Sequence, residues 1–346
     1  MHPQRLKPDN FTPATRTPWG GRKILTRYKA ALGLDVQHAV VGESWEVSVE
    51  PSFPSSTLQG TALSELIASD PVGWLGGAVA EAYGGASPLL VKLLDTADNL
   101  SVQVHPAPDD PALAPDESGK PESWIVLDAE PGAGIYLGFR DGVSAQQVRR
   151  CLETRGPLDE LMNFVPAVPG DAFVIRAGTV HAIGAGVTMI EPQHVTPGRR
   201  GLTYRFWDWN RLYDEQGRLD MVGGKPRQLH VKRSLEVTAW DSPGGEAFVQ
   251  SCRANGELLQ SGSLEQWLVL RTPYFEAERW QGTGALEAST GDAMTALTCV
   301  AGEATVETPL GSVSLETGVS AVIPAAAASM SVTAKGAQIF VSRSCA

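Results

Sequence analysis

Short runs of β-branched, aromatic and aliphatic residues dominate this chain of 346 residues, and glycine, proline and aspartate separate the runs. Strands bounded by such turn residues are typical of β-sandwiches and β-barrels. The clearest predicted strands lie at residues 124–127, 134–139, 172–175, 187–190, 267–270 and 339–342. The sequence therefore predicts an all-β protein with a few helices.

Three segments interrupt the β pattern and predict helices. The clearest covers residues 144–154, because Ser144 is a suitable N-cap and apolar residues recur behind it at helical spacing. Residues 63–69 predict a second helix. Residues 72–83 predict a third, although two adjacent glycines lie inside it. The stretch 107–119 is rich in proline and aspartate and predicts a surface loop.

Two segments, 170–181 and 318–329, resemble each other without gaps. Each predicts a turn, a buried strand, a second turn and then a residue that faces a barrel interior. That residue is His181 in the first segment and Ser329 in the second. We interpret the pair as a duplicated barrel with one metal-binding copy. The alternative is a chance likeness between two β-turn-β stretches.

The boundary between the two copies is predicted near Lys225, which follows two glycines. Residues 1–225 would then form an N-terminal metal-binding domain with helical insertions. Residues 226–346 would form a C-terminal domain of the same kind. This second domain is predicted to lack metal ligands, because no histidine follows His230.

Candidate metal ligands occur at three places in the N-terminal part. Gln103 and His105 alternate on a predicted strand, so their side chains share one face. Glu122 follows Lys-Pro, which keeps the backbone extended at the mouth of a strand. With His181 they offer two imidazoles, one carboxylate and one amide oxygen. Such a set predicts a divalent metal site with N and O ligands, open to water and therefore catalytic.

Each of these residues also has an ordinary structural explanation. A lone histidine on a half-buried strand is usually a packed core residue, and a lone glutamate is usually a surface carboxylate. The shared face of Gln103 and His105 favours the metal site. The other histidines lack comparable settings, and we predict that they are not ligands: His2, His38, His194 and His230.

Composition limits the partners of the chain. The net charge of -11 argues against nucleic acids and anionic membranes, since both bind basic surfaces. It leaves room for a small phosphorylated substrate bound by local cations. No apolar run is long enough to span a bilayer, and the N-terminus lacks the apolar core of a signal peptide. The four cysteines are widely spaced, which predicts free thiols and a cytoplasmic location.

Six segments carry a resemblance to a known family: residues 18–22, 42–46, 89–106, 119–124, 177–186 and 203–211. In order and spacing they resemble the signatures of type I mannose-6-phosphate isomerases, in particular the shorter bacterial members. The likeness runs from about Leu6 to Arg211. The C-terminal third matches only in its general pattern of short strands and turns. Several motifs in the right order are a specific signal, whereas any one of them alone would be weak.

The resemblance implies a double-cupin fold, that is, two jelly-roll-like β-barrels with small helical insertions. It implies one zinc ion per chain, held by Gln103, His105, Glu122 and His181. It also implies an isomerase that interconverts mannose 6-phosphate and fructose 6-phosphate through a cis-enediol(ate). Three further residues match family positions: Arg205 the catalytic arginine, Lys120 a lysine beside the site, and Glu191 a carboxylate near the substrate.

The chain departs from the family pattern on the substrate side. Residues 194–202 form a longer and more basic connection than in the short family members. Arg199 and Arg200 therefore compete with Arg205 for the catalytic position, and we predict that they bind the substrate phosphate. Either Glu191 or Lys120 would serve as the proton-relay base.

Three alternative functions stay open from the sequence. Two histidines, a glutamate and a glutamine would also hold Fe(II) or Mn(II) in a cupin oxygenase. An isomerase of the same fold could act on a different sugar, given the altered 194–202 segment. A sugar-binding cupin without catalysis is the third alternative. In the favoured interpretation the partner is a small sugar phosphate.

Overall fold

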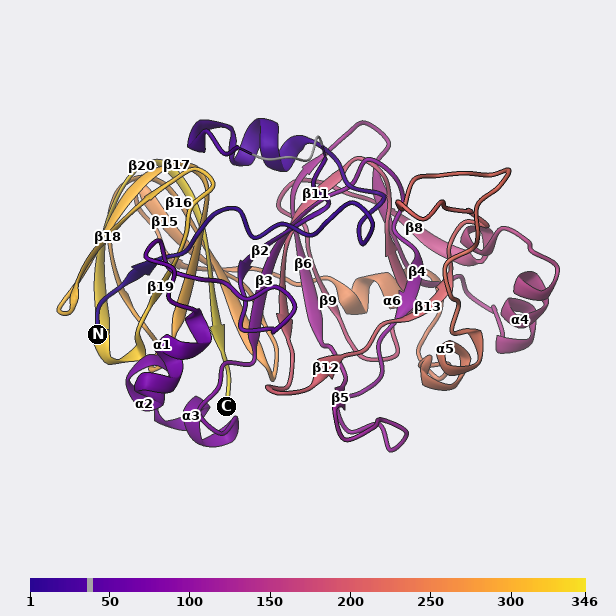
Figure 1. Ribbon diagram of the computed structural model, residues 1–346, viewed down its shortest axis with the longest axis horizontal. Coiled ribbons are helices and arrows are strands. Elements are labelled where there is room, and N and C mark those ends of the chain that lie inside the picture. Colours follow the sequence, from indigo (N-terminus) through magenta and orange to yellow (C-terminus); the bar gives the residue numbers. More distant parts are fainter. Residues whose placement is uncertain (36–39) are drawn as a thin grey trace.

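The structure is a computed structural model that describes residues 1–35 and 40–346. Strands dominate it, and they form three large sheets (Figure 1). Two five-stranded sheets from the N-terminal two thirds of the chain face each other. The C-terminal third forms an eight-stranded sheet, shown in orange and yellow at the left of Figure 1.

Within each of the two N-terminal sheets, all paired strands are antiparallel. The first sheet follows the order β13-β4-β10-β7-β8, and the second follows β2-β3-β11-β6-β9. The first contains β4 (Val102–Val104), β7 (Gly134–Phe139), β8 (Met162–Pro166), β10 (His181–Ile183) and β13 (Tyr204–Trp207). The second contains β2 (Glu43–Val47), β3 (Leu89–Asp95), β6 (Glu122–Ala129), β9 (Ala172–Ile175) and β11 (Val187–His194).

The C-terminal sheet follows the order β1-β19-β17-β20-β16-β15-β14, with β18 paired to β17. The N-terminal strand β1 belongs to it, so the chain begins against its own C-terminal part. Its strands are β1 (Gln4–Arg5), β14 (Glu257–Gln260), β15 (Leu264–Arg271), β16 (Phe275–Ser289), β17 (Thr295–Thr308), β18 (Gly311–Glu316), β19 (Ser320–Ile323) and β20 (Ser329–Ser344). A separate parallel pair joins β5 (Glu117–Ser118) to β12 (Arg200–Gly201).

Short helices lie around the sheets (Figure 1). The α-helices are α1 (Leu63–Ser69), α2 (Pro71–Leu75), α3 (Gly77–Ala82), α4 (Ala145–Glu153), α5 (Val231–Val237) and α6 (Gly245–Cys252). Single turns of other helix types are η1 (Ile24–Tyr28), η2 (Ala30–Leu32), η3 (Leu158–Leu161) and η4 (Ala325–Ala327). Ser144 caps α4 through a capping box with Gln147, as the sequence predicts for a helix start.

The segment 72–83 forms two helices instead of one, and the break falls at Gly76. This residue has φ +82°, and a Cβ added to it would lie 1.8 Å from the carbonyl oxygen of Asp292. Only glycine fits such a left-handed position in close contact with another backbone. The adjacent glycines therefore end α2 and allow α3 to begin in a new direction.

The fold class predicted from the sequence is confirmed. The chain is mainly β with a few helices, and its strand order gives cupin-like sheets that stay open. The division at residue 225 stays a prediction. Helices α5 and α6, which follow that residue, pack against β13 and β7 of the N-terminal sheets. Among the described residues, no helix is long and apolar enough to cross a membrane.

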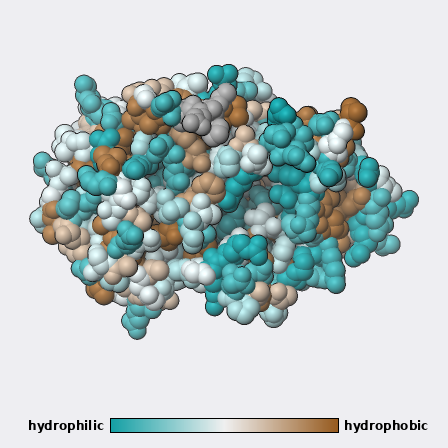
Figure 2. All heavy atoms as spheres, viewed as in Figure 1, coloured by the Kyte–Doolittle hydropathy of each residue, from teal (hydrophilic) through white to brown (hydrophobic). Residues whose placement is uncertain are grey.

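Hydrophobic side chains fill the space inside the sheets. Hydrophilic residues predominate on the face shown in Figure 2, including its lower centre, where β5 and β12 lie. The strands β3 and β11 are buried along their whole length, which explains the nearly continuous apolar sequence of β3. Lys92 on β3 and Glu191 on β11 interrupt that pattern, and both are buried. These two buried charged residues lie beside the candidate site.

Candidate metal centre

The two N-terminal sheets bring three predicted ligands together between them. Glu122 opens β6 of one sheet and His181 opens β10 of the other, while His105 directly follows β4. The turn before His181 fixes its position, because the N–H of Gly178 donates to the carbonyl oxygen of His105 at 2.9 Å. All three ligand side chains are buried, with relative exposures of 0–2%.

The two imidazoles are oriented by backbone carbonyl groups. Nδ1 of His105 lies 2.9 Å from the carbonyl oxygen of Leu202, and Nδ1 of His181 lies 2.9 Å from that of Thr179. A carbonyl oxygen only accepts, so each Nδ1 carries the hydrogen that it donates. In its neutral form each ring therefore presents an unprotonated Nε2. This tautomer, fixed by a carbonyl group, is the one in which histidine binds a metal through Nε2.

The carboxylate of Glu122 lies between the two free ring nitrogens. Its Oε2 is 3.3 Å from Nε2 of His105, and its Oε1 is 3.2 Å from Nε2 of His181. Both Nε2 atoms and Oε1 lack a hydrogen-bond partner within the described part of the chain. Three buried acceptors that face one another are unfavourable unless a cation joins them.

The spacing of these atoms fits a metal ion. One ligand atom from each residue lies within 4.8 Å of the others. Bonds of about 2.1 Å at tetrahedral angles would place neighbouring ligand atoms about 3.4 Å apart. The separations of 3.2 and 3.3 Å are close to that value. The donor set therefore fits a divalent ion with N and O ligands.

Electrostatics keep the site in the ionisation state that binds a cation. Burial lowers the pKa of His105 to about 4, against the attraction of Glu122, so the ring is neutral near pH 7. Burial opposes the ionisation of Glu122, but positively charged neighbours hold its pKa well below its usual range. Lys120 is one of these neighbours, with Nζ 3.4 Å from Oε2.

Gln103, the fourth predicted ligand, lies on the same face of its sheet as His181. It is the direct cross-strand partner of His181 on β10 and of Arg205 on β13. Directly opposed residues of antiparallel strands project to the same side. The side chain of Gln103 is half-buried. Its role as a metal ligand stays a prediction.

Glu191 lies in a buried charged network next to the cluster. Nε1 of Trp124 donates to its Oε1 at 3.0 Å, and Nζ of Lys92 is 3.5 Å from its Oε2. Lys92 also lies 3.8 Å from Glu43. Burial and the charge of Glu122 raise the pKa of Glu191, against the effect of Lys92. The network thus holds a carboxylate with a raised pKa beside the metal cluster.

Arg205 is half-buried on β13. Its Nε donates to Oγ of Ser101 at 3.3 Å, and its Nη1 donates to the carbonyl oxygen of Gln228 at 3.0 Å. Among residues 1–35 and 40–346, no carboxylate forms a salt bridge with it, whereas the nearby Arg227 is paired with Asp208 at 2.7 Å. Burial and the charge of Arg227 lower the pKa of Arg205. Arg205 is therefore a partly desolvated cation without a carboxylate partner in the described chain.

Arg199 and Arg200 lie elsewhere. Both are exposed in the connection between β11 and β13, and Arg200 pairs with Glu117 at 2.8 Å on the surface. The structure thus brings Lys120 and Glu191 to the cluster and leaves this arginine pair at the surface. Their role in substrate binding stays a prediction.

Sequence reasoning missed three buried residues around the cluster. Trp124 packs its ring edge against His181, with centroids 5.2 Å apart, and Nε2 of Gln193 donates to Oε2 of Glu122 at 2.7 Å. Lys92 is the third. Strand periodicity contained the signal, because Trp124 is two residues from Glu122 and Gln193 two from Glu191. A single lysine inside the apolar run 89–94 was a further signal.

The remaining histidines have other environments. His194 points to the opposite face of β11 from Gln193, and its ring packs against Tyr83 and Tyr274 at centroid distances of 5.4 and 4.9 Å. Nδ1 of His230 accepts the N–H of Arg205 at 3.1 Å. His38 lies outside the described residues.

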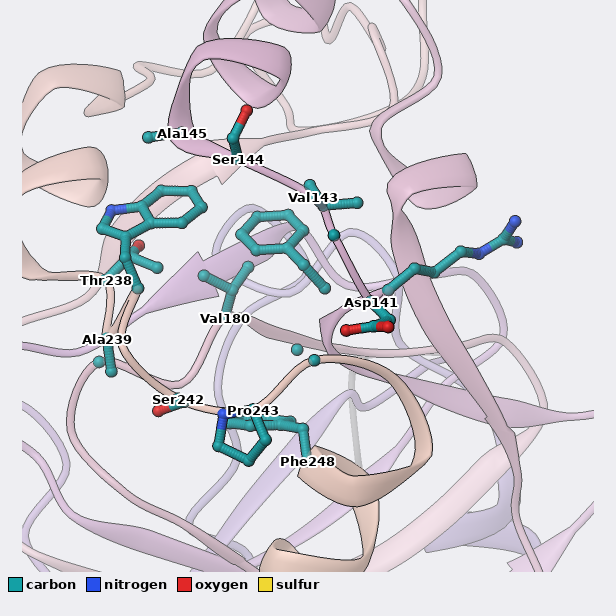
Figure 3. Close-up of a pocket in the computed structure, with 17 residues that line it drawn as sticks. Asp141, Val143, Ser144, Ala145, Val180, Thr238, Ala239, Ser242, Pro243 and Phe248 are labelled. Atoms are coloured by element: carbon teal, nitrogen blue, oxygen red, sulfur yellow. The ribbon is translucent and has the colours of Figure 1, made fainter.

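A cavity of about 540 Å³ has none of the three cluster residues in its lining (Figure 3). Its lining comes from the end of β7, the start of α4 and the segment 238–248, with Val180 on one wall. A second cavity of about 390 Å³ lies between the N-terminal and C-terminal parts, where residues 271–275 face the strand pair β6 and β9. Glu122 is among the residues that line this second cavity.

Comparisons with known proteins agree with this geometry. The family described as phosphomannose isomerase type I, catalytic domain, matches residues 14–132. The mannose-6-phosphate isomerase cupin domain matches residues 266–343. Mannose-6-phosphate isomerase of Streptococcus mutans is 30% identical over 317 residues, which cover 88% of each chain. The chain belongs to the type I mannose-6-phosphate isomerase family. The family resemblance expected from the sequence is thereby confirmed, and with it an isomerase enzyme.

Two further comparisons extend the family relationship. Mannose-6-phosphate isomerase ManA of Bacillus subtilis is 33% identical over 229 residues, which cover 63% of this chain and 64% of that relative. The crystal structure of mannose 6-phosphate isomerase from Bacillus subtilis aligns with a TM-score of 0.80 at 22% identity. That alignment covers 99% of this chain and all of the other. The cupin-like fold is therefore shared with that structure along nearly the whole chain.

Proposed function

We propose that this isomerase interconverts mannose 6-phosphate and fructose 6-phosphate through a cis-enediol(ate), with one zinc ion per chain. Membership of the family and the buried cluster of His105, Glu122 and His181 support the proposal. The observation that carries it is the set of three buried acceptor atoms facing one another. Substrate, metal identity and reaction path are parts of the same proposal.

The residues that would hold zinc are His105, Glu122 and His181, with Gln103 as the fourth. Catalytic zinc sites use N and O ligands and keep one position for water or substrate. When bound, zinc supplies Lewis acidity that stabilises the negative charge developing on the sugar oxygens. Lys120, 3.4 Å from Glu122, adds positive charge at the edge of the same site.

The proton transfer would be carried by Glu191. A general base works best when its pKa approaches the working pH, and burial raises the pKa of this carboxylate. Trp124 fixes one of its oxygens by a hydrogen bond, which leaves the other beside Lys92. Glu191 would take the proton from C2 of the aldose and return it to C1. Lys120, which forms an ion pair with Glu122, would act as a cation.

Arg205 would hold the developing oxyanion or the phosphate. It lies on the strand beside Gln103, and it is partly buried without a carboxylate partner in the described chain. Its planar guanidinium suits both kinds of oxygen. Arg199 and Arg200 would contact the phosphate only if the 194–202 segment folds over the bound sugar.

A coupled assay with zinc-loaded protein tests the proposal. We expect turnover of mannose 6-phosphate and of fructose 6-phosphate, about one zinc per chain, and no consumption of oxygen. Iron retention with oxygen uptake would instead support the oxygenase alternative, which the family matches disfavour. A panel of aldose phosphates would identify a different sugar if mannose 6-phosphate is not turned over. A cytoplasmic location is part of the proposal and is tested by cell fractionation.

A further inference from the structure

The two oxygens of Glu122 have different surroundings. Oε2 accepts a hydrogen bond from Nε2 of Gln193 at 2.7 Å and lies 3.4 Å from Nζ of Lys120. Oε1 has no hydrogen-bond partner in the part of the chain that the structure describes. It lies 3.2 Å from Nε2 of His181. Each oxygen thus lies beside one ring nitrogen, since Oε2 is 3.3 Å from Nε2 of His105, but within the described chain only Oε2 accepts a hydrogen bond.

The backbone fixes the contact between Gln193 and Glu122. The two residues are direct cross-strand partners on β11 and β6, so their side chains project side by side from one face. Their relative exposures are 0% and 1%. A hydrogen bond to an ionised carboxylate is stronger than a neutral one, and this bond is shielded from water. The pair is therefore a rigid unit.

The orientation of the Gln193 amide follows from its partner. An ionised carboxylate only accepts, so the amide nitrogen must face Glu122. The amide oxygen of Gln193 is then buried, and it has no hydrogen-bond partner among the described residues. An apolar side chain at this position would avoid that unfavourable burial. The glutamine is better explained by what its nitrogen does to Glu122.

We infer that Gln193 is a positioning residue of the metal centre, which holds Oε2 of Glu122 so that Oε1 alone binds the ion. This inference rests on the proposed metal site. Groups that orient a ligand in this way typically change metal affinity by about 10- to 100-fold when they are replaced. Lys120 contacts the same oxygen from a greater distance, on a side chain that is 14% exposed. Gln193 is therefore the main constraint on the carboxylate.

The test replaces Gln193 by methionine, which keeps the length and removes the donor. We expect the zinc dissociation constant, measured by competition with a chromophoric chelator, to rise about 10- to 100-fold. The visible spectrum of the Co²⁺-loaded variant should also shift, because the carboxylate can rotate. Both readouts are independent of turnover.

A matched control exists in the C-terminal sheet. Nε2 of Gln266 donates to Oε2 of Glu278 at 2.8 Å, which is the same kind of bond far from the metal cluster. Gln266→Met should lower thermal stability and leave zinc affinity within about twofold of the parent. A general effect of losing an amide donor to a glutamate is thereby separated from an effect on the metal.

Three outcomes are distinguishable. Parent-like zinc affinity in Gln193→Met would overturn the inference. Failure of the parent chain to bind zinc would instead refute the proposed function. If Gln193→Met does not fold, the crystal structure of the zinc-loaded parent decides. Oε1 of Glu122 bound to zinc and Oε2 bound to Gln193 would support the inference, while bidentate binding or binding through Oε2 would overturn it.

Discussion

The N-terminal and C-terminal sheets enclose interiors of opposite character. Between the N-terminal sheets lie two free imidazoles and a carboxylate, which leave three acceptor atoms without a partner in the described chain. The C-terminal sheet surrounds an apolar core that includes Trp280 and Leu297. Its buried charges satisfy each other, since Arg343 forms salt bridges with Glu276 and Glu278.

The two similar segments, 170–181 and 318–329, show the same contrast at single residues. In 170–181, β9 and a turn lead to His181 at the start of β10, inside the site. In 318–329, β19 and the short helix η4 lead to Ser329 at the start of β20, and Ser329 is exposed, so the prediction that it faces a barrel interior is wrong. The same strand-turn-strand arrangement therefore presents a candidate metal ligand in the N-terminal segment. In the C-terminal segment it only builds a sheet. Unsatisfied buried acceptors persist where a cation can compensate their burial.

The largest expected effect comes from removing this difference. His181→Ser gives the N-terminal segment the residue of its C-terminal counterpart. Zinc content, measured by mass spectrometry, should fall from about one per chain towards zero, and turnover should fall by about 10³-fold or more. Ser329→Ala, the matched control, should keep both. Equal zinc content in the two variants would break the comparison.

Arg205→Ala should reduce catalysis without removing the metal. The guanidinium lies on the strand next to Gln103 and would stabilise a charge that forms during the reaction. We expect kcat to fall by about 10²- to 10³-fold while zinc content is retained. Arg200→Ala, which removes a surface ion pair, serves as the control and should change kcat little. A larger loss in Arg200→Ala would move the oxyanion role to the 194–202 segment.

Lys92→Met tests whether the N-terminal charges depend on each other as those of the C-terminal sheet do. When the ammonium group of Lys92 is removed, the buried Glu191 and the half-buried Glu43 lose their shared cation. The free energy of unfolding, measured in urea, should fall by about 3–5 kcal/mol. Arg343→Met should destabilise the C-terminal sheet comparably and leave zinc affinity unchanged. An unaltered unfolding free energy in Lys92→Met would show that the network is not an interacting unit.

The smallest effect concerns the contact between the two regions. His194 packs against Tyr274 of the C-terminal part, and burial lowers its pKa from 6.5 to about 4. The unfolded chain therefore binds a proton that the folded chain does not, so stability is lost as the pH falls from about 6.5 towards 4. Compared with His194→Phe, the parent should lose about 2 kcal/mol more between pH 7.5 and pH 5. Parallel pH profiles of the two proteins would contradict this.

The sequence predicted the features that depend on local patterns. The alternation of Gln103 and His105 and the N-cap at Ser144 follow from strand and helix chemistry within a few residues, whereas the single helix predicted for 72–83 was wrong because its glycines break it in two. The ligand cluster was also predictable, because each ligand stands at the start or end of a recognisable strand. The resemblance to the family indicated that these separate motifs come together in one site.

Features that depend on how distant strands pair were not predictable. The contact of Lys92 with Glu191 requires the register of β3 and β11, and that of Gln193 with Glu122 requires the register of β11 and β6. No local pattern fixes these registers. The surface position of Arg199 and Arg200 likewise depends on the path of a connection that pairs through β12 with β5.

X-ray absorption at the zinc edge distinguishes the proposed metal site from one bound by cysteine. We expect a single zinc ion with only N and O neighbours at about 2.0–2.2 Å, two of them imidazoles. The four cysteines provide the contrast, since all are free thiols in the described structure. A sulfur neighbour at about 2.3 Å, or a chain that binds no zinc in stoichiometric amount, would contradict the proposed site.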